Sequence, residues 1–127
     1  MKIDKDAKYR SSHEWARKDG NRIVAGISDH AQDALGDIVF VELPAVGKAF
    51  KQGEAFGVVE SVKAASDIFM PMSGKIVAVN EALASDPAVV NRDPYAGGWF
   101  IAFEPSNPAE WDALMTPAAY EIESGKE

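Results

Sequence analysis

Residues 57–68 have the sequence Gly57-Val58-Val59-Glu60-Ser61-Val62-Lys63-Ala64-Ala65-Ser66-Asp67-Ile68. The stretch begins within a β-prone run, Phe56 to Val59, which is followed by small and polar residues around Lys63. A second β-prone run begins at Ile68 and ends at Pro71. Two such runs separated by a short segment of small residues are typical of a β-hairpin. The pattern predicts a hairpin with Lys63 near its tip and the lysine ammonium in water. Taken alone, such a lysine is an ordinary solvated surface residue.

Short β-prone segments and turn signals continue on both sides of this hairpin. Strands are predicted over 12–17 and 22–27, joined by an Asp19-Gly20 turn, and over 38–43, 75–79 and 99–103. Residues 45–54 predict turns around a short strand, and residues 80–94 a loop with a helical turn at 81–84 or 88–90. Many short strands separated by turns predict a mostly β fold, and the pattern alone leaves sandwich and flattened barrel open.

Helix signals occur in the middle and at the end of the chain. Ser28 is a good N-cap, Asp29 suits the positive end of a helix, and Gly36 can close that helix with a positive φ. Asn107-Pro108-Ala109-Glu110 resembles a capping box and predicts a helix to about 115, followed by a second helix from 117 to about 122. The polar residues 124–127 are expected to fray.

Composition restricts the classes of function. The 127 residues predict a single domain over 1–127. The formal net charge of −7 argues against a nucleic-acid partner, which requires a basic face. The first six residues, Met1 to Asp6, are charged and polar, which predicts neither a signal peptide nor a membrane span. We expect a cytoplasmic protein, or one of the mitochondrial matrix if the chain is a trimmed organelle form.

The segment around Lys63 resembles the lipoyl-attachment segment of the glycine cleavage system H-protein family. The matching letters are Glu60-Ser61-Val62-Lys63-Ala64, then Ser66-Asp67 and Pro71-Met72-Ser73-Gly74. Further blocks follow the order of the family: Ser12-His13-Glu14-Trp15, Gly26-Ile27-Ser28-Asp29-His30-Ala31-Gln32, Leu35 to Pro44, Val79-Asn80-Glu81-Ala82-Leu83, and Asp93-Pro94-Tyr95 to Gly98-Trp99. Several ordered blocks around a modifiable lysine are a far more specific signal than one short motif.

The resemblance implies both a fold and a function. The fold would be a lipoyl/biotinyl-domain-like hybrid β-sandwich, a flattened barrel with a short internal helix and a C-terminal helical cap. The function would be that of a non-catalytic carrier in glycine catabolism and one-carbon metabolism, with lipoic acid bound covalently to Lys63. It would carry an aminomethyl group from the pyridoxal-phosphate glycine decarboxylase (P protein) to the tetrahydrofolate-dependent aminomethyltransferase (T protein). Lipoamide dehydrogenase (L protein) would reoxidise the carrier, and a lipoate-attaching enzyme would load it.

The resemblance also implies roles for individual residues. Glu60, Gly47 and Gly74 would help the lipoate-attaching enzyme to find the lysine, although both glycines are equally explained as turn glycines. The cleft that holds the loaded arm would comprise Ser12, Glu14, Ile27, Leu35, Ala64 and Asp67. The cargo has a cationic amine, and we expect Glu14 to face it, with Asp67 as the second choice. The alternative is that these are solvated strand carboxylates and that Ile27 and Leu35 are ordinary core residues.

Other functions remain open at this point. An H-like lipoyl relay or donor for 2-oxoacid dehydrogenases would have the same attachment site. A biotin carrier would have methionine on both sides of the lysine, where this chain has Val62 and Ala64. A small hydrolase would need a nucleophile with a base, and Ser12 and His13 would face opposite sides of a strand. We expect His13 and His30 to have neither a cysteine nor a close histidine partner, and therefore expect no metal site.

Overall fold

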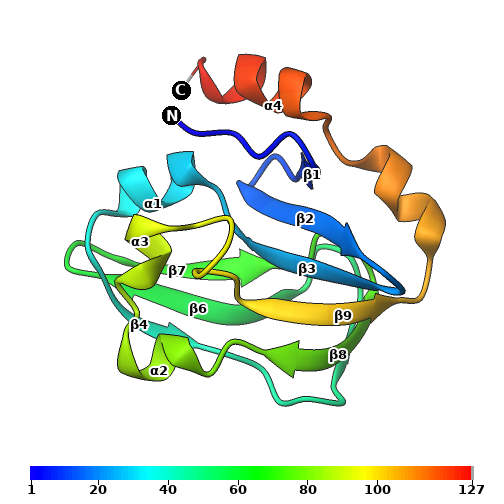
Figure 1. Cartoon of the computed structure of the whole chain (residues 1–127), viewed down its shortest axis with the longest axis horizontal. Coiled ribbons are helices and arrows are strands. Elements are labelled where there is room, and N and C mark those ends of the chain that lie inside the picture. The colour runs from blue at the N-terminus through cyan, green and yellow to red at the C-terminus, as the bar shows by residue number, and fades with distance from the viewer. Residues whose placement is uncertain (127) are drawn as a thin grey trace.

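The computed structural model describes residues 1–126, which form nine β-strands, four α-helices and one 3₁₀ helix (Figure 1). In chain order these are β1 (Ala7–Tyr9), β2 (Glu14–Asp19), β3 (Arg22–Ile27), α1 (Asp29–Leu35), β4 (Ile38–Glu42), β5 (Ala49–Phe50), β6 (Ala55–Ser61), β7 (Ala65–Phe69), β8 (Gly74–Val79), α2 (Ala82–Ser85), α3 (Val89–Arg92), β9 (Ile101–Pro105), η1, the 3₁₀ helix (Pro108–Ala113), and α4 (Pro117–Ser124).

The strands form two antiparallel sheets. The larger sheet has the order β1-β2-β3-β9-β8-β5 and the smaller has the order β4-β6-β7. The two sheets lie against each other as a flattened barrel, with α1, α2 and α3 at one end (Figure 1). The mostly β sandwich-like fold expected from the sequence is therefore confirmed.

The core lies between the inner faces of the two sheets. Val59 and Ile68 from the smaller sheet meet Ile76 and Phe103 from the larger, and each of these side chains is almost fully buried. Burying a side chain of this size stabilises the fold by about 1.5–3 kcal/mol. Because the side chains of a strand alternate between its two faces, the residues next to these core positions face outward.

The hairpin predicted around Lys63 is confirmed as β6 and β7. Val59 lies opposite Ser66 and Glu60 opposite Ala65, and the turn comprises residues 61–64. The amide of Ser61 donates to the carbonyl of Ala64 (2.8 Å), and the Ser61 hydroxyl accepts from the amides of Lys63 and Ala64 (3.2 Å each). The Ser61 side chain thus satisfies the backbone donors of the turn and holds Lys63 at the tip.

Helix α1 begins and ends as the sequence predicts. The Ser28 hydroxyl accepts from the Ala31 amide (3.2 Å) and caps the N-terminus, with Asp29 in the first turn. Gly36 closes the helix with φ 80° and ψ −158°. The positive φ is as expected, but the ψ value lies outside the left-handed helical region, in a conformation that is essentially restricted to glycine.

The C-terminal helix covers the outer edge of the larger sheet (Figure 1). Tyr120 of α4 stacks on Tyr9 of β1, with ring centroids 4.3 Å apart. Tyr9 also exchanges two backbone hydrogen bonds with Met115, at 2.9 and 2.8 Å. These contacts fix the helical cap that the resemblance predicted. Strand β1, which the sequence did not predict, provides the surface on which the cap lies.

Several boundaries differ from the predictions. Residues 108–113 form a 3₁₀ helix instead of an α-helix, and the Asn107 side chain makes no capping hydrogen bond. The Glu110 carboxylate instead accepts from the amide (2.7 Å) and hydroxyl (3.0 Å) of Ser73, so this acid connects two segments of the chain. The last strand starts at Ile101, two residues later than predicted, and both candidate helical turns of 80–94 form.

The predicted frayed tail is wrong for its first residue. Helix α4 extends through Ser124, which is buried and donates a hydrogen bond to the Glu121 carbonyl (3.3 Å). Glu127, the last residue of that predicted tail, lies outside the described residues. Across residues 1–126, we find no helix with both the length and the apolar character needed to cross a membrane.

Candidate functional site

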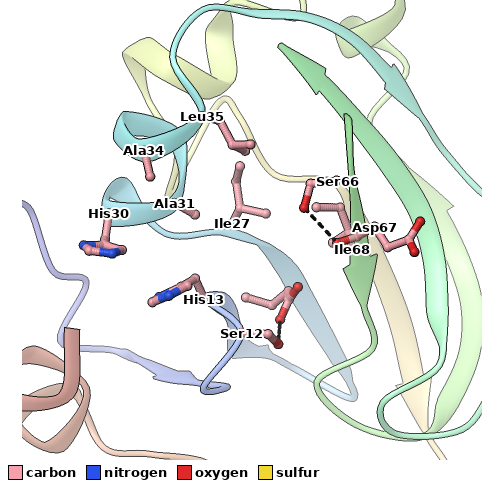
Figure 2. A pocket seen from close by; sticks show the side chains of 11 residues that line it. Ser12, His13, Ile27, His30, Ala31, Ala34, Leu35, Ser66, Asp67 and Ile68 are labelled. Carbon is pink, nitrogen blue, oxygen red and sulfur yellow. Dashed lines mark hydrogen bonds between the residues drawn. The ribbon is translucent and has the colours of Figure 1, made fainter. Parts of the chain in front are cut away.

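A cavity of about 500 Å³ opens between α1, the start of β2 and strand β7 (Figure 2). It is lined by Ser12, His13, Glu14, Ile27, His30, Ala31, Ala34, Leu35, Ser66, Asp67 and Ile68. Its volume falls within the range of about 300–1,000 Å³ that is usual for small-molecule sites. Five of the six residues predicted for the arm-docking cleft thus line a single cavity, and Ala64 does not.

Glu14 is the buried acid of this cavity. It is the first residue of β2, lies opposite Ile27 in the sheet and is only 2% exposed. One carboxylate oxygen accepts a hydrogen bond from the Ser12 hydroxyl, and the other accepts from the Phe69 amide (3.1 Å). The Ser12 hydroxyl in turn accepts from the Arg10 guanidinium (2.5 Å). These bonds fix the orientation of the carboxylate.

Burial raises the pKa of Glu14 above the ordinary value of a glutamate. The hydrogen bonds from Ser12 and from the Phe69 amide, and the nearby charge of Arg10, lower this pKa and so reduce the rise. A carboxylate in such surroundings is expensive to ionise alone, and a cation brought next to it favours the charged form. Glu14 is therefore suited to receive a cationic group that enters the cavity.

Apolar side chains form much of the remaining wall. Ile27 and Ile68 are nearly fully buried and Leu35 is partly buried. Ala31 and Ala34 line the cavity from α1, where their small side chains leave space. Figure 2 shows Ile27, Leu35 and the alanines on one side of the cavity, with β7 opposite. This wall suits an aliphatic chain or a sulfur-containing ring.

Lys63 lies beside the cavity at the tip of the hairpin. It is exposed, and its Nζ donates to the Ala34 carbonyl (3.4 Å), which belongs to a cavity-lining residue of α1. The lysine side chain also crosses Gly36, where a Cβ on residue 36 would lie only 3.0 Å from Lys63 Cε. Lys63 Nζ is thus open to solvent and next to the α1 wall of the cavity.

Two histidines that the sequence had separated come together at this cavity. The rings of His13 and His30 have centroids 4.6 Å apart, so the expectation that they lack a close histidine partner is wrong. His13 has a φ of 80° and precedes β2, which is why Ser12 and His13 both line the cavity instead of facing opposite sides of a strand. Among the described residues, no group of three or more His, Cys, Asp or Glu is arranged to hold a metal ion.

A hydrogen-bonded chain connects the His13 wall to the C-terminal helix. His13 Nδ1 lies 2.7 Å from the Tyr120 hydroxyl, which is also 2.7 Å from the Ser28 hydroxyl. Tyr120 and Ser28 are both nearly fully buried. Helix α4 therefore supports the cavity from behind, through the cap of α1 and through His13.

One predicted cleft residue lies outside the cavity, and a second lines it with its side chain turned away. Ala64 is exposed in the hairpin turn and does not line the cavity. Asp67 belongs to the lining, but its carboxylate points away from the cavity (Figure 2). It is exposed on β7 opposite Val58, on the outer face of the smaller sheet. The geometry therefore favours Glu14 over Asp67 as the acid that faces the cavity.

Of the three predicted recognition residues, Glu60 lies apart from the two glycines, which lie near each other because the Gly47 amide donates to the carbonyl of Ile76 (2.8 Å), two residues after Gly74. Glu60 is exposed next to the Lys63 turn, on the outer face of β6. Gly74 lies opposite Pro105, and this end of β9 is at the opposite end of the molecule from the β6–β7 turn (Figure 1). Gly74 is required by packing, because a Cβ there would lie 2.5 Å from the Phe103 ring, and Gly47 by its φ of 96°. Backbone geometry accounts for both glycines, and their part in recognition stays a prediction.

Sequence reasoning missed the cavity-lining residues His13, His30, Ala31, Ala34, Ser66 and Ile68. Some signal for them existed. Ala31, Ala34 and Leu35 have the spacing of one helix face, and Ser66 and Ile68 the spacing of one strand face. The position of the two histidines had no such signal, because it depends on the positive φ of His13.

Comparison with known proteins places this geometry in a family. The family model described as Glycine cleavage H-protein matches residues 7–127. The glycine cleavage system H protein of Anaeromyxobacter sp. (strain K) is 54% identical over 120 residues, which cover 94% of both chains. That of Carboxydothermus hydrogenoformans is 56% identical over 119 residues, which cover 94% of this chain and 92% of the relative.

A solved structure agrees with the sequence matches. The crystal structure of a glycine cleavage system H protein from Mycobacterium marinum superposes with a TM-score of 0.89 at 40% sequence identity. The superposition covers 97% of this chain and 99% of that one. With its exposed hairpin lysine, its adjacent cavity and these matches over nearly the whole length, the chain belongs to the glycine cleavage H-protein family.

Proposed function

We propose that this protein is the lipoyl carrier of a glycine cleavage system, with lipoic acid attached through an amide to Lys63 Nζ. Family membership supports the lipoyl carrier role in glycine cleavage. The carrier would take an aminomethyl group from the glycine decarboxylase (P protein) to the tetrahydrofolate-dependent aminomethyltransferase (T protein). Lipoamide dehydrogenase (L protein) would then restore the disulfide. The protein itself would be a carrier subunit and not an enzyme.

The observation that carries this proposal is the position of Lys63 Nζ. The atom is exposed at a hairpin tip, so that modifying enzymes can reach it, and it lies 3.4 Å from the carbonyl of Ala34 in the cavity wall. A group attached there begins at the cavity and can either lie in it or swing into solvent. A shuttle needs both positions, one for protecting the cargo and one for presenting it to partner enzymes.

The cavity fits the group that the family implies. A lipoyl arm has an aliphatic stem and a dithiolane, and the wall of Ile27, Leu35 and Ile68 is apolar. When bound, the group supplies a disulfide that takes up the aminomethyl unit as it is reduced. The aminomethyl cargo has a cationic amine, and Glu14 offers the buried carboxylate for it.

The residues of the cavity would bind, orient and protect the cargo. Ser12 and the Phe69 amide hold the two oxygens of Glu14, so the carboxylate is already oriented when the amine arrives. A docked amine favours ionised Glu14, which offsets the effect of burial on its pKa. The apolar wall excludes water from the bound cargo and thereby slows its breakdown to formaldehyde and ammonia. A relay for 2-oxoacid dehydrogenases would carry no such cation and would have no use for this acid.

The proposal is tested with Lys63→Arg in a reconstituted glycine–bicarbonate exchange assay. Arginine keeps the charge but cannot form the lipoyl amide, so exchange should be lost. Because Lys63 is exposed at a turn, the variant should unfold at the same temperature as the wild type. Lys75→Arg, at an exposed position of β8, is the matched control and should retain wild-type exchange. Exchange at the wild-type rate in Lys63→Arg would refute the proposal.

A further inference from the structure

An exposed apolar patch lies on the outer side of the smaller sheet, next to the hairpin. It consists of Val39, Phe40 and Val62, which are 53%, 51% and 67% exposed, and we call it the β4 patch. A regular strand would turn Val39 and Phe40 to opposite faces. A break in the β4–β6 register between Ile38 and Phe40 leaves both exposed instead. Clustered exposed apolar side chains often mark protein–protein contacts.

The β4 patch flanks the Lys63 turn directly. Phe40 lies opposite Glu60, and Glu60 lies opposite Ala65, so these three residues form one row across the sheet. Val62 precedes Lys63, and its amide donates to the Asp37 carbonyl (3.1 Å). Strand β4 is an edge of the smaller sheet, beside β6 (Figure 1). A protein that covers the lysine from this side also covers the patch.

Acidic side chains surround the β4 patch. Asp37 precedes the strand, Glu42 ends it and Glu60 lies opposite Phe40, and all three are exposed. An apolar centre with an acidic rim is complementary to an apolar surface rimmed by Lys and Arg. The charge of this rim thus selects a basic partner and would also speed its association at low salt.

We propose that the β4 patch is the docking surface for the enzyme that attaches lipoate to Lys63, through an apolar surface with a basic rim. This inference rests on the proposed function. The distance from the patch to the atom on which each partner enzyme acts distinguishes the attaching enzyme from the others. Before modification the acceptor is Nζ itself, at the end of only four methylene groups, so the attaching enzyme must cover the turn and its flanks. Enzymes that act on the far end of a finished arm can stand a full arm length away.

The test measures lipoylation of the unmodified protein by a lipoate ligase with ATP and lipoate, followed by intact mass. Phe40→Gln should raise the KM for the acceptor protein about tenfold or more, as expected for an aromatic residue central to an interface, with kcat changed less than about twofold. Val62→Gln lies in the turn, outside the strand ladder, and should raise KM in the same direction. Asp37→Asn and Glu42→Gln should raise KM about two- to threefold at low salt and have no effect at high salt.

Ile122→Gln is the matched control, because Ile122 is as exposed as Val62 but lies on α4. It should be lipoylated like the wild type. Wild-type KM values for both Phe40→Gln and Val62→Gln would overturn the docking proposal and leave the carrier function intact. Normal lipoylation with impaired glycine–bicarbonate exchange would assign the patch to a different partner and so also overturn it. No modification of wild-type Lys63 by an active ligase would instead refute the proposed function itself.

Discussion

The role of Glu14 leads to a specific prediction for Glu14→Gln. Glutamine has the same shape, and its amide oxygen can still accept the hydrogen bond from the Phe69 amide that Glu14 accepts at 3.1 Å. The substitution removes the negative charge from a side chain that is only 2% exposed. The cavity should therefore keep its shape while losing its attraction for a cationic amine.

The size of the effect follows from the contact that is lost. A hydrogen bond that involves a charged group contributes about 1.5–3 kcal/mol in proteins. This free energy corresponds to a roughly 10- to 150-fold change in the docking equilibrium. Because docked cargo is protected and undocked cargo is exposed to water, hydrolysis should speed up by a similar factor. The rate for a fully undocked arm sets the upper limit.

The assay loads lipoylated protein with glycine and the decarboxylase, removes the enzyme and follows the release of formaldehyde. Asp67→Asn is the matched control, because the Asp67 carboxylate points away from the cavity (Figure 2), and it should change the rate less than about twofold. Release at the wild-type rate from Glu14→Gln would refute the reasoning. Equal acceleration in Asp67→Asn would refute the distinction between the two acids.

Three further predictions concern stability. Burial raises the pKa of Glu14, so the native state keeps a proton that the unfolded state has lost, and the free energy of unfolding should fall as pH rises from the ordinary glutamate pKa through the raised one. Glu14→Gln should lack this fall in urea titrations between pH 4 and 8. An equal fall of the free energy of unfolding with pH in both proteins would contradict the assignment to Glu14. Gly36→Ala should lower the free energy of unfolding, measured in urea, by about 1–3 kcal/mol, because φ 80° with ψ −158° is strained for alanine. An unchanged free energy of unfolding would argue against this backbone conformation. Tyr120→Phe should lower the free energy of unfolding by about 1–3 kcal/mol, because it removes a hydroxyl that hydrogen-bonds both the Ser28 hydroxyl and the His13 ring. A smaller change by thermal unfolding would show that water replaces these hydrogen bonds.

Much of the fold could be predicted because local signals and long-range pairing agree. Three local signals determine conformations that are compatible with the strand pairing: the Asp19-Gly20 turn, the Ser28 cap and the small residues around Lys63. The prediction of a capping box at Asn107 was wrong because Glu110 makes its hydrogen bonds elsewhere. Glu110 binds Ser73, which is 37 residues away in sequence, instead of closing a capping box. No local pattern contains that contact.

The candidate site was predictable where chemistry is tied to one residue, and less so where it depends on which way a side chain points. The exposed position of Lys63 follows from the hairpin signal. Glu14 and Asp67 are both acids in predicted strands, and only the sheet register separates them, with Glu14 opposite Ile27 and Asp67 opposite Val58. The contact between the His13 and His30 rings depends on the φ of 80° at His13, a backbone conformation that the residue types in this segment do not predict.

The central claim is that Lys63 carries the arm, and an intact mass measurement tests it most directly. The protein would be treated with a lipoate ligase, ATP and lipoate, and the modified residue mapped by fragmentation. We predict a single lipoyl increment on Lys63 and none on the other exposed lysines. A folded protein without any increment, when the same ligase modifies a control lipoyl domain, would contradict this claim, as would an increment on a different lysine.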